Sequence, residues 1–209
     1  GTVGTPWGEA EKQQWLSEQQ IKRSYKDEVV TPLQQFLPDT AELLNYGTLD
    51  YSAFHLPVYE LFAVRSKNWQ ADKPIVLVTG GVHGYETSGV QGALKFIKEQ
   101  FSHYSTKVNL LVLPCISPWG YETINRWNPK AVDPNRSFGA ESQSEEASLA
   151  MAFVRQHQGE VLVHIDLHET TDSDNSEFRP AKAARDGTVN HNWNIPDGFY
   201  LVGDTDKPE

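Results

Sequence analysis

Cysteine is almost absent from this 209-residue sequence, and the single thiol of Cys115 leaves no partner for an internal disulfide. Cys115 lies in the apolar run LLVLPCI, a context that favours a buried and unreactive side chain. The scarcity of cysteine is typical of a reducing compartment, so we expect a cytoplasmic protein.

Long hydrophobic runs are also missing, because no stretch reaches the roughly 18 apolar residues that suggest a membrane-spanning helix. The first residues, GTVGTPWGEAEKQQW, contain no basic segment followed by an apolar one, so no signal peptide is predicted. We therefore expect no membrane partner.

Basic residues are outnumbered: 18 lysines and arginines stand against 28 aspartates and glutamates, for a net charge of -10. Such a chain has no surplus of cations to neutralise phosphates, so nucleic acid is not expected as a partner. Hydrophobic residues at 38% and charged residues at 22% are typical of a folded globular protein. The length predicts a single domain over residues 1–209.

Apolar patterns predict several strands. Residues 57–66 alternate apolar and polar side chains, as a half-buried strand does. Continuous apolar runs are typical of fully buried core strands, and three are present: 74–81, 108–114 and 161–168.

Helices are predicted between and before these strands. Residues 8–25 have a polar amphipathic pattern, and apolar residues recur at helical spacing over 90–101. A further helix is expected over 144–158, with Ser142 and Glu145 as its capping box. Buried strands that alternate with helices predict an α/β fold with helices on both faces of the sheet.

The remaining segments are less regular. Residues 31–50 are mixed and broken by prolines and a glycine, and the chain after about residue 170 becomes polar and irregular. A last candidate strand is FYLV at 199–202, followed by an open tail, TDKPE. We therefore expect the domain to be incomplete at its C-terminus.

Two predicted strand ends carry metal-ligand side chains, in the region where open α/β sheets gather functional groups. GGVHGYE at 80–86 follows one strand, and its His83 and Glu86 are spaced so that a helical turn brings both to one side. His168 ends another strand. Two imidazoles and one carboxylate form a three-ligand zinc site that leaves a fourth position for water.

A third segment strengthens this interpretation, because His-x-x-Glu alone is common by chance. ISPWGYE at 116–122, NRWN at 125–128 and VDPNRSF at 132–138 follow the next core strand. The order of motifs resembles that of the metallocarboxypeptidase superfamily, which includes zinc carboxypeptidases and acylamino-acid deacylases. The matching positions are His83 with Glu86, Pro118-Trp119-Gly120, Arg126, Asp133-Pro134-Asn135-Arg136 and His168.

The resemblance implies roles for three further residues. Arg126 would face the oxyanion that develops during hydrolysis, where a fixed cation favours the transition state. Asn135 and Arg136 would hold a free carboxylate of the substrate, for which a guanidinium fork is suited.

Two neighbours of His168 need separate interpretation. His164 shares its strand face and is an alternative ligand, although the DLH sequence ending in His168 resembles the deacylases. Asp166 lies on the same face and is expected to orient a ligand histidine. We expect the other histidines to lie outside the site: His55, His103, His157 and His191.

The function implied by the resemblance is zinc-dependent hydrolysis of an amide bond next to a residue with a free carboxylate. A metallocarboxypeptidase with one zinc per chain and a peptide substrate is the first hypothesis. A deacylase of N-acyl amino acids, of the desuccinylase/aspartoacylase type, and a non-catalytic zinc-binding relative are the alternatives. The implied fold has three layers, with a mixed, mostly parallel sheet between helices.

The general base of the family is a glutamate on a late strand, and no residue in 170–209 fits it. Glu169 adjoins a ligand, but its side chain is expected on the opposite face of the strand. We assign no base and expect the sequence to be a piece of a longer protein.

Overall fold

The computed structural model describes residues 1–157, 159–192, 194–195 and 198–203. It contains two compact units, one formed by Gly8–Glu169 and the other by Gly1–Trp7 together with Thr170–Glu209. The single domain over 1–209 stays a prediction.

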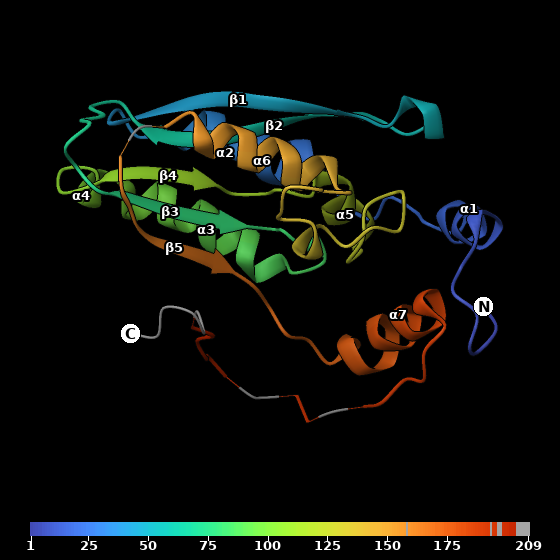
Figure 1. The fold of residues 1–209 in the computed structure, drawn as a ribbon. Coiled ribbons are helices and arrows are strands. Elements are labelled where there is room, and N and C mark those ends of the chain that lie inside the picture. The colour runs from blue at the N-terminus through green and yellow to red at the C-terminus, as the bar shows by residue number, and fades with distance from the viewer. Residues whose placement is uncertain (158, 193, 196–197, 204–209) are drawn as a thin grey trace. The chain divides into compact units, whose positions relative to one another are not determined.

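The larger unit is built on a five-stranded sheet in the order β1-β2-β4-β3-β5 (Figure 1). β3 pairs in parallel with both β4 and β5, whereas β2 is antiparallel to β1 and to β4. β2 is therefore the one strand of this sheet that runs against the others. The strands are β1 (Ala41–Asp50), β2 (Val58–Ser66), β3 (Ile75–Gly80), β4 (Asn109–Leu113) and β5 (Val161–Leu167).

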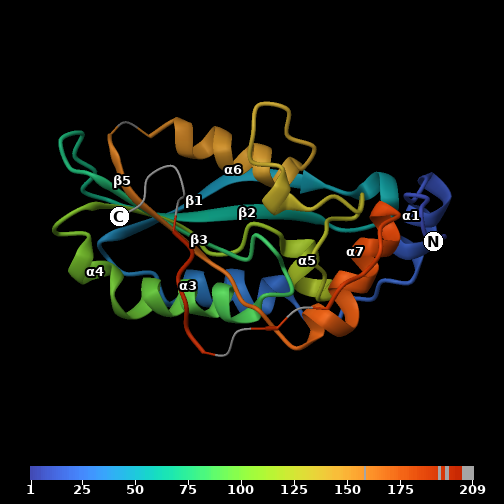
Figure 2. The same ribbon diagram turned by 60° about the horizontal axis from the view of Figure 1, so that its bottom comes forward.

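Helices cover both faces of this sheet, which confirms the predicted α/β fold with a mixed, mostly parallel sheet. Figure 2 shows α6 on one side of the strands and α3 on the other. The helices of this unit are α1 (Glu9–Ser17), α2 (Thr31–Phe36), α3 (Thr87–Glu99), α4 (Phe101–Tyr104), α5 (Pro118–Thr123) and α6 (Glu145–Arg155).

Alternate residues of the central strands supply two apolar layers. Leu110 and Val112 of β4 pack in the cluster that includes α3 residues such as Ile97. Leu111 of β4 packs instead in the cluster that includes Phe153 of α6. Because both faces are covered, β3 and β4 are apolar at most positions, as predicted.

β5 departs from the prediction of a third core strand. It pairs only with β3 and lies at the edge of the sheet. Three of its apolar side chains are exposed, with Val161 at 45%, Leu162 at 64% and Ile165 at 43% of their accessible surface. The sequence predicted a strand here correctly but gave no information on its position at the edge.

The segment 31–50, expected to be mixed and broken by prolines and a glycine, contains α2 and β1. A shift in register between Asn45 and Gly47 marks a bulge in the pairing of β1 with β2, so the glycine is accommodated without ending the strand. A Cβ at Gly47 would lie 3.0 Å from the Leu149 side chain, so the glycine also allows α6 to pack closely. α5 was likewise not predicted.

Two predicted helices have different ends. The first runs only over Glu9–Ser17 rather than 8–25. α6 ends at Arg155, and its cap is Ser144, which accepts a hydrogen bond from the Ala147 amide. Ser142 instead donates to the Ser144 carbonyl, so the predicted capping box is wrong. Residue 158, at the predicted end of this helix, lies outside the described residues.

The smaller unit contains α7 (Arg179–Asp186) after a π-helical turn over Asp174–Phe178. This segment was expected to be irregular. No strand forms at 199–202, contrary to the prediction, and the tail at 205–209 lies outside the described residues. Over the part of the chain that is described, no helix is both long and apolar enough to cross a membrane.

Candidate metal centre

The carboxyl ends of β3 and β5 bring the predicted ligands together. The two strands are parallel neighbours, and Gly80 at the end of β3 is paired with Leu167 at the end of β5. His168 is the next residue after β5, and His83 lies three residues beyond β3. Residues far apart in the sequence therefore meet at the carboxyl ends of these two strands.

The loop that carries His83 and Glu86 is fixed by two glycines. Gly81 has a φ of +61°, a left-handed conformation that lets the chain turn off the strand. A Cβ at Gly84 would lie 2.0 Å from the backbone of Gly120 and Tyr121, so this loop packs directly on α5. The loop thus has little freedom to move away from α5.

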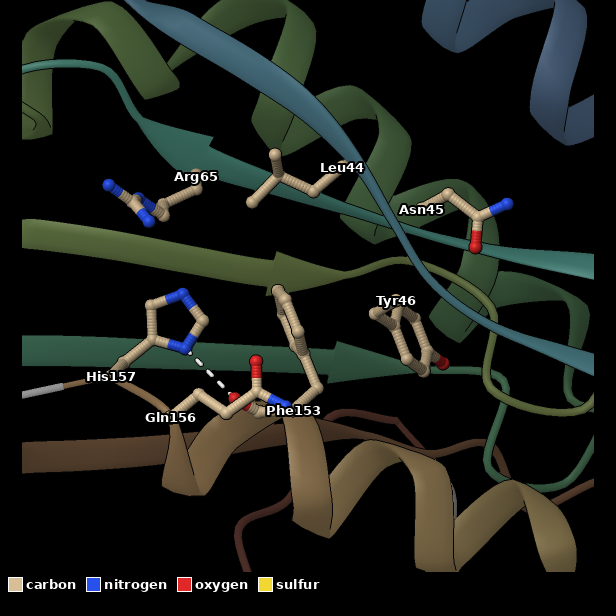
Figure 3. Close-up of a pocket in the computed structure, with 7 residues that line it drawn as sticks. All are labelled: Leu44, Asn45, Tyr46, Arg65, Phe153, Gln156 and His157. Atoms are coloured by element: carbon tan, nitrogen blue, oxygen red, sulfur yellow. Dashed lines mark hydrogen bonds between the residues drawn. The ribbon is translucent and has the colours of Figure 1, made fainter.

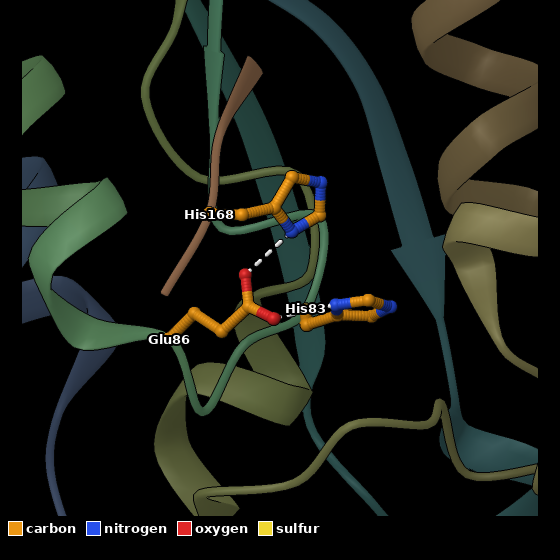
Figure 4. Close-up of side chains that lie close together, drawn as sticks. All are labelled: His83, Glu86 and His168. Carbon is orange, nitrogen blue, oxygen red and sulfur yellow. Dashed lines mark hydrogen bonds and ion pairs between the residues drawn. The ribbon is translucent and has the colours of Figure 1, made fainter. Parts of the chain in front are cut away.

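Glu86 lies between two imidazoles (Figure 4). The Nδ1 atom of His83 is 2.7 Å from one carboxylate oxygen of Glu86, and the Nδ1 atom of His168 is 2.6 Å from the other. The ligand atoms of the three residues all lie within 4.8 Å of one another. Two imidazole nitrogens and one carboxylate oxygen are a donor set that suits zinc and leaves a coordination position open.

The outer nitrogen of each imidazole faces an aspartate. The Nε2 atom of His83 is 3.0 Å from Asp133, and the Nε2 atom of His168 is 2.7 Å from Asp166. Carboxylates in this position orient histidine ligands and select their tautomer. The sequence predicted such a role for Asp166. It did not predict one for Asp133, for which the only signal was its place in the Asp-x-Asn-Arg motif.

The pKa values of these groups reflect their mutual contacts. Burial alone would raise the pKa of Glu86, but hydrogen bonds from His168 and His83 lower it to about 2. Burial disfavours the charged form of His168, yet hydrogen bonds to Asp166 and Glu86 raise its pKa to about 10. The pKa of Asp133 is held well below its usual value by His83 and Arg126, against the effect of burial. The carboxylates of Glu86, Asp133 and Asp166 therefore surround the two histidines with negative charge.

His164, the alternative ligand, lies outside this cluster. Its Nε2 atom is 2.8 Å from the Thr79 hydroxyl, and the same hydroxyl donates to Asp166 at 2.6 Å. Thr79 thus fixes the carboxylate that faces His168. The geometry favours His168 over His164 as the ligand from β5.

Arg126 is held beside the cluster. Its Nε donates to Asp133 at 3.1 Å, and its Nη1 donates to the Tyr85 hydroxyl at 3.4 Å. Arg126 thereby supports the carboxylate that faces His83. Its contact with a substrate oxyanion stays a prediction.

Asn135 and Arg136 lie on a short 3-10 turn (Pro134–Arg136) that begins after Asp133. The backbone N–H of Asn135 donates to the Asp133 carboxylate at 3.0 Å, which connects this turn to the histidine cluster. Arg136 is exposed, and no ion pair to it occurs among the described residues. Their role in holding a substrate carboxylate stays a prediction.

Glu169 has a structural contact of its own. Its carboxylate accepts a hydrogen bond of 2.9 Å from the Ser88 amide, in the first turn of α3. Its own amide donates to Glu86 at 3.2 Å. The side chain is therefore used as a helix cap.

A separate surface pocket of about 350 Å³ lies between β1, β2 and α6 (Figure 3). None of the predicted site residues lines it. His157 does, with its ring 4.7 Å from that of Phe153, so this histidine is a packing residue. His55 and His103 are exposed, and His191 belongs to the smaller unit.

Comparison with known families agrees with this geometry. The profile of the succinylglutamate desuccinylase/aspartoacylase catalytic domain matches residues 72–192, which is more than half of the chain. No curated protein matches the sequence.

Solved structures share the fold. One from Shewanella baltica OS155 is 25% identical with a TM-score of 0.53, over 62% of this chain and 49% of that one. A metallo-carboxypeptidase from Burkholderia cenocepacia is 14% identical with a TM-score of 0.54, over 79% and 42%. Carboxypeptidase A from Helicoverpa armigera is 17% identical with a TM-score of 0.54, over 73% and 46%. The chain spans about half the length of these structures or less.

Proposed function

Since the chain belongs to the succinylglutamate desuccinylase/aspartoacylase catalytic domain family, we propose that it is part of a zinc-dependent hydrolase. The enzyme would cleave an amide bond next to a residue that bears a free carboxylate. The observation that carries this proposal is the convergence of His83, Glu86 and His168, whose ligand atoms lie within 4.8 Å of one another.

The residues of this cluster and its neighbours have different proposed roles. His83, Glu86 and His168 would hold one zinc ion, which when bound supplies a Lewis acid and lowers the pKa of a water ligand. With a cation bound, Asp133 and Asp166 would accept the N–H of the outer imidazole nitrogens, which would leave Nδ1 of each ring as the ligand atom. Arg126 stabilises the Asp133 carboxylate from its other side.

Substrate binding is proposed for Asn135 and Arg136. Arg136 is exposed on a turn that is joined to the cluster through Asp133, and its guanidinium suits a carboxylate bidentately. The sequence match to the desuccinylase/aspartoacylase family favours an N-acyl amino acid as substrate. The likeness to carboxypeptidases is one of fold, so cleavage of a C-terminal peptide bond is the second candidate.

The metal content of the purified protein tests the proposal. After dialysis in chelator-free buffer, we expect close to one zinc per chain in the wild type and strong loss in His83→Ala. The matched control is His103→Ala, which removes an exposed imidazole outside the cluster and should leave the metal content unchanged.

Hydrolysis is then assayed on N-acyl amino acids and on N-blocked dipeptides, each with a free and an amidated carboxyl group. Faster cleavage of N-acyl amino acids would favour the deacylase, and faster cleavage of dipeptides the carboxypeptidase. A wild type without zinc, or equal zinc in His83→Ala and the wild type, would contradict the metal site.

A further inference from the structure

Arg23 lies far from the metal loop in the sequence, before the segment that matches the family, yet its side chain reaches that loop. Its Nη2 donates to the Gly84 carbonyl at 2.9 Å, across 61 residues of sequence. Gly84 is the residue directly after His83. The guanidinium therefore contacts the backbone between the two proposed ligands of the loop.

The other donors of Arg23 fix what surrounds this loop. Nη1 donates to the Thr87 hydroxyl at 2.7 Å, and Thr87 is the first residue of α3, directly after Glu86. Nε donates to the Tyr121 carbonyl of α5 at 2.5 Å. The planar guanidinium of Arg23 thus connects the middle of the loop, at Gly84, with the start of α3 and with α5.

Arg23 itself is held in place. Its guanidinium carbon lies 3.5 Å from the centre of the Tyr121 ring, a cation–π contact. The Lys22 and Arg23 amides both point to the Glu122 carbonyl, at 2.8 and 3.3 Å. Backbone and side chain are both anchored on α5, so the guanidinium has little freedom to leave the loop.

We propose that Arg23 is a positioning residue that keeps His83 and Glu86 at the spacing required for metal binding. This inference rests on the proposed metal site. Arginine is needed because only a guanidinium offers donors in three directions from one plane, whereas a lysine ammonium is a point charge on a flexible stem. The ligands themselves do not contact Arg23, so it acts through the backbone of Gly84 and through Thr87.

The test compares Arg23→Ala and Arg23→Lys with the wild type and with Arg155→Ala. Arg155 is an exposed residue of α6, so its removal changes the net charge equally but away from the loop. Zinc affinity is measured by competition with a chromophoric chelator. Hydrogen exchange of the amides in 84–87 and in β4 is measured on the metal-free proteins.

We expect zinc affinity to fall on the order of tenfold in Arg23→Ala, as for outer contacts of metal ligands. Arg23→Lys should fall between Arg23→Ala and the wild type, and Arg155→Ala should equal the wild type. Exchange should become faster in 84–87 of Arg23→Ala while β4 keeps its protection.

Three outcomes would overturn the proposal: unchanged zinc affinity in Arg23→Ala, an equal loss in Arg155→Ala, or faster exchange throughout β4. A wild type that binds no zinc would refute the metal site instead. Faster exchange confined to 84–87 of Arg23→Ala would then still support the role of Arg23 in holding the loop.

Discussion

Each of the two histidine rings lies between two carboxylates. Glu86 faces the Nδ1 atoms, and Asp133 and Asp166 face the Nε2 atoms. A histidine that binds a cation is neutral and carries one proton, and an aspartate at Nε2 would stabilise that proton there. The lone pair of Nδ1 is then directed toward Glu86, where a cation would be shared.

Arg136 provides a prediction about substrate binding. Arg136→Ala should weaken the binding of ligands with a free carboxylate by about 10- to 100-fold, because a charge-assisted hydrogen bond contributes about 1.5–3 kcal/mol. Amidated analogues should bind almost as before, and Arg136→Lys should recover only part of the loss. Isothermal titration calorimetry measures this, with Arg155→Ala as control. Equal losses for acid and amide ligands would assign Arg136 a structural role.

Gly84 provides a prediction about stability. Gly84→Ala would place a Cβ 2.0 Å from backbone atoms of α5, which cannot move aside as a side chain would. We expect the free energy of unfolding to fall by about 1–3 kcal/mol, together with zinc affinity. Gly139→Ala is the control, since a Cβ there meets nothing within 4 Å. Urea denaturation measures the free energy of unfolding of both variants. Similar free energies for Gly84→Ala and Gly139→Ala would contradict the close packing at Gly84.

The sequence predicted the three proposed ligands more readily than the residues that contact or support them. His83, Glu86 and His168 lie at strand ends in recognisable motifs, and Asp166 shares a strand face with His168. Asp133 contacts His83 across 50 residues, and Arg23 contacts Gly84 across 61. Such contacts depend on the path of loops, which no local pattern encodes.

The element that carries Arg126 and Asp133 is the loop between α5 and α6, and a buried carboxylate holds it. Glu146 accepts hydrogen bonds from Asn128 at 3.1 Å, from Ser144 at 2.5 Å and from the Tyr51 hydroxyl. The side-chain oxygen of Asn128 in turn accepts from the Lys130 and Val132 amides. The loop is thereby fixed up to the residue before Asp133.

Glu146→Gln should therefore lower the free energy of unfolding by about 1–3 kcal/mol, because an amide nitrogen replaces one buried acceptor. Glu145→Gln is the control: Glu145 is exposed and pairs with Lys130 at the surface, so its effect should stay below about 1 kcal/mol. Chemical denaturation gives both values. A loss for Glu145→Gln as large as that for Glu146→Gln would show that the buried network adds nothing.

Elements were predicted where apolar side chains form a continuous or periodic pattern, and they were missed where that pattern is short, interrupted or polar. β3 and β4 were recognised by continuous apolar runs and α3 by apolar residues at helical spacing, because these side chains are buried between the sheet and its helices. β1 contains a bulge at Gly47, which interrupts the alternation that marks a strand. α7 is mostly polar, and its signals were local ones, Pro180 in the first turn and Gly187 at the end.

At the scale of the whole molecule, the exposed edge of the sheet is the main departure from the pattern of α/β proteins. Parallel strands are normally covered on both faces, whereas β5 exposes Val161, Leu162 and Ile165. An open edge with apolar side chains is a site for association between chains.

Leu162→Lys should reduce self-association of the 209-residue chain, because a charge on an edge strand disfavours pairing with another edge. Light scattering over a range of protein concentrations measures the effect. Val3→Lys adds the same charge at an exposed apolar position outside the sheet and should change association little. If both variants associate as the wild type does, the edge of β5 is not the contact.

The contact between His168 and Glu86 also bears on the conformational entropy of the unfolded chain. The two residues are 82 positions apart, so any tie between them closes a long loop of the polypeptide. A permanent link of this span restricts the unfolded chain by about 4.5 kcal/mol in the simplest polymer treatment. A cation held by both residues would act as such a link, and it would join the end of the edge strand β5 to the loop between β3 and α3. Chelation would remove this stabilisation, so the metal would contribute to the stability of the fold as well as to what the site can bind.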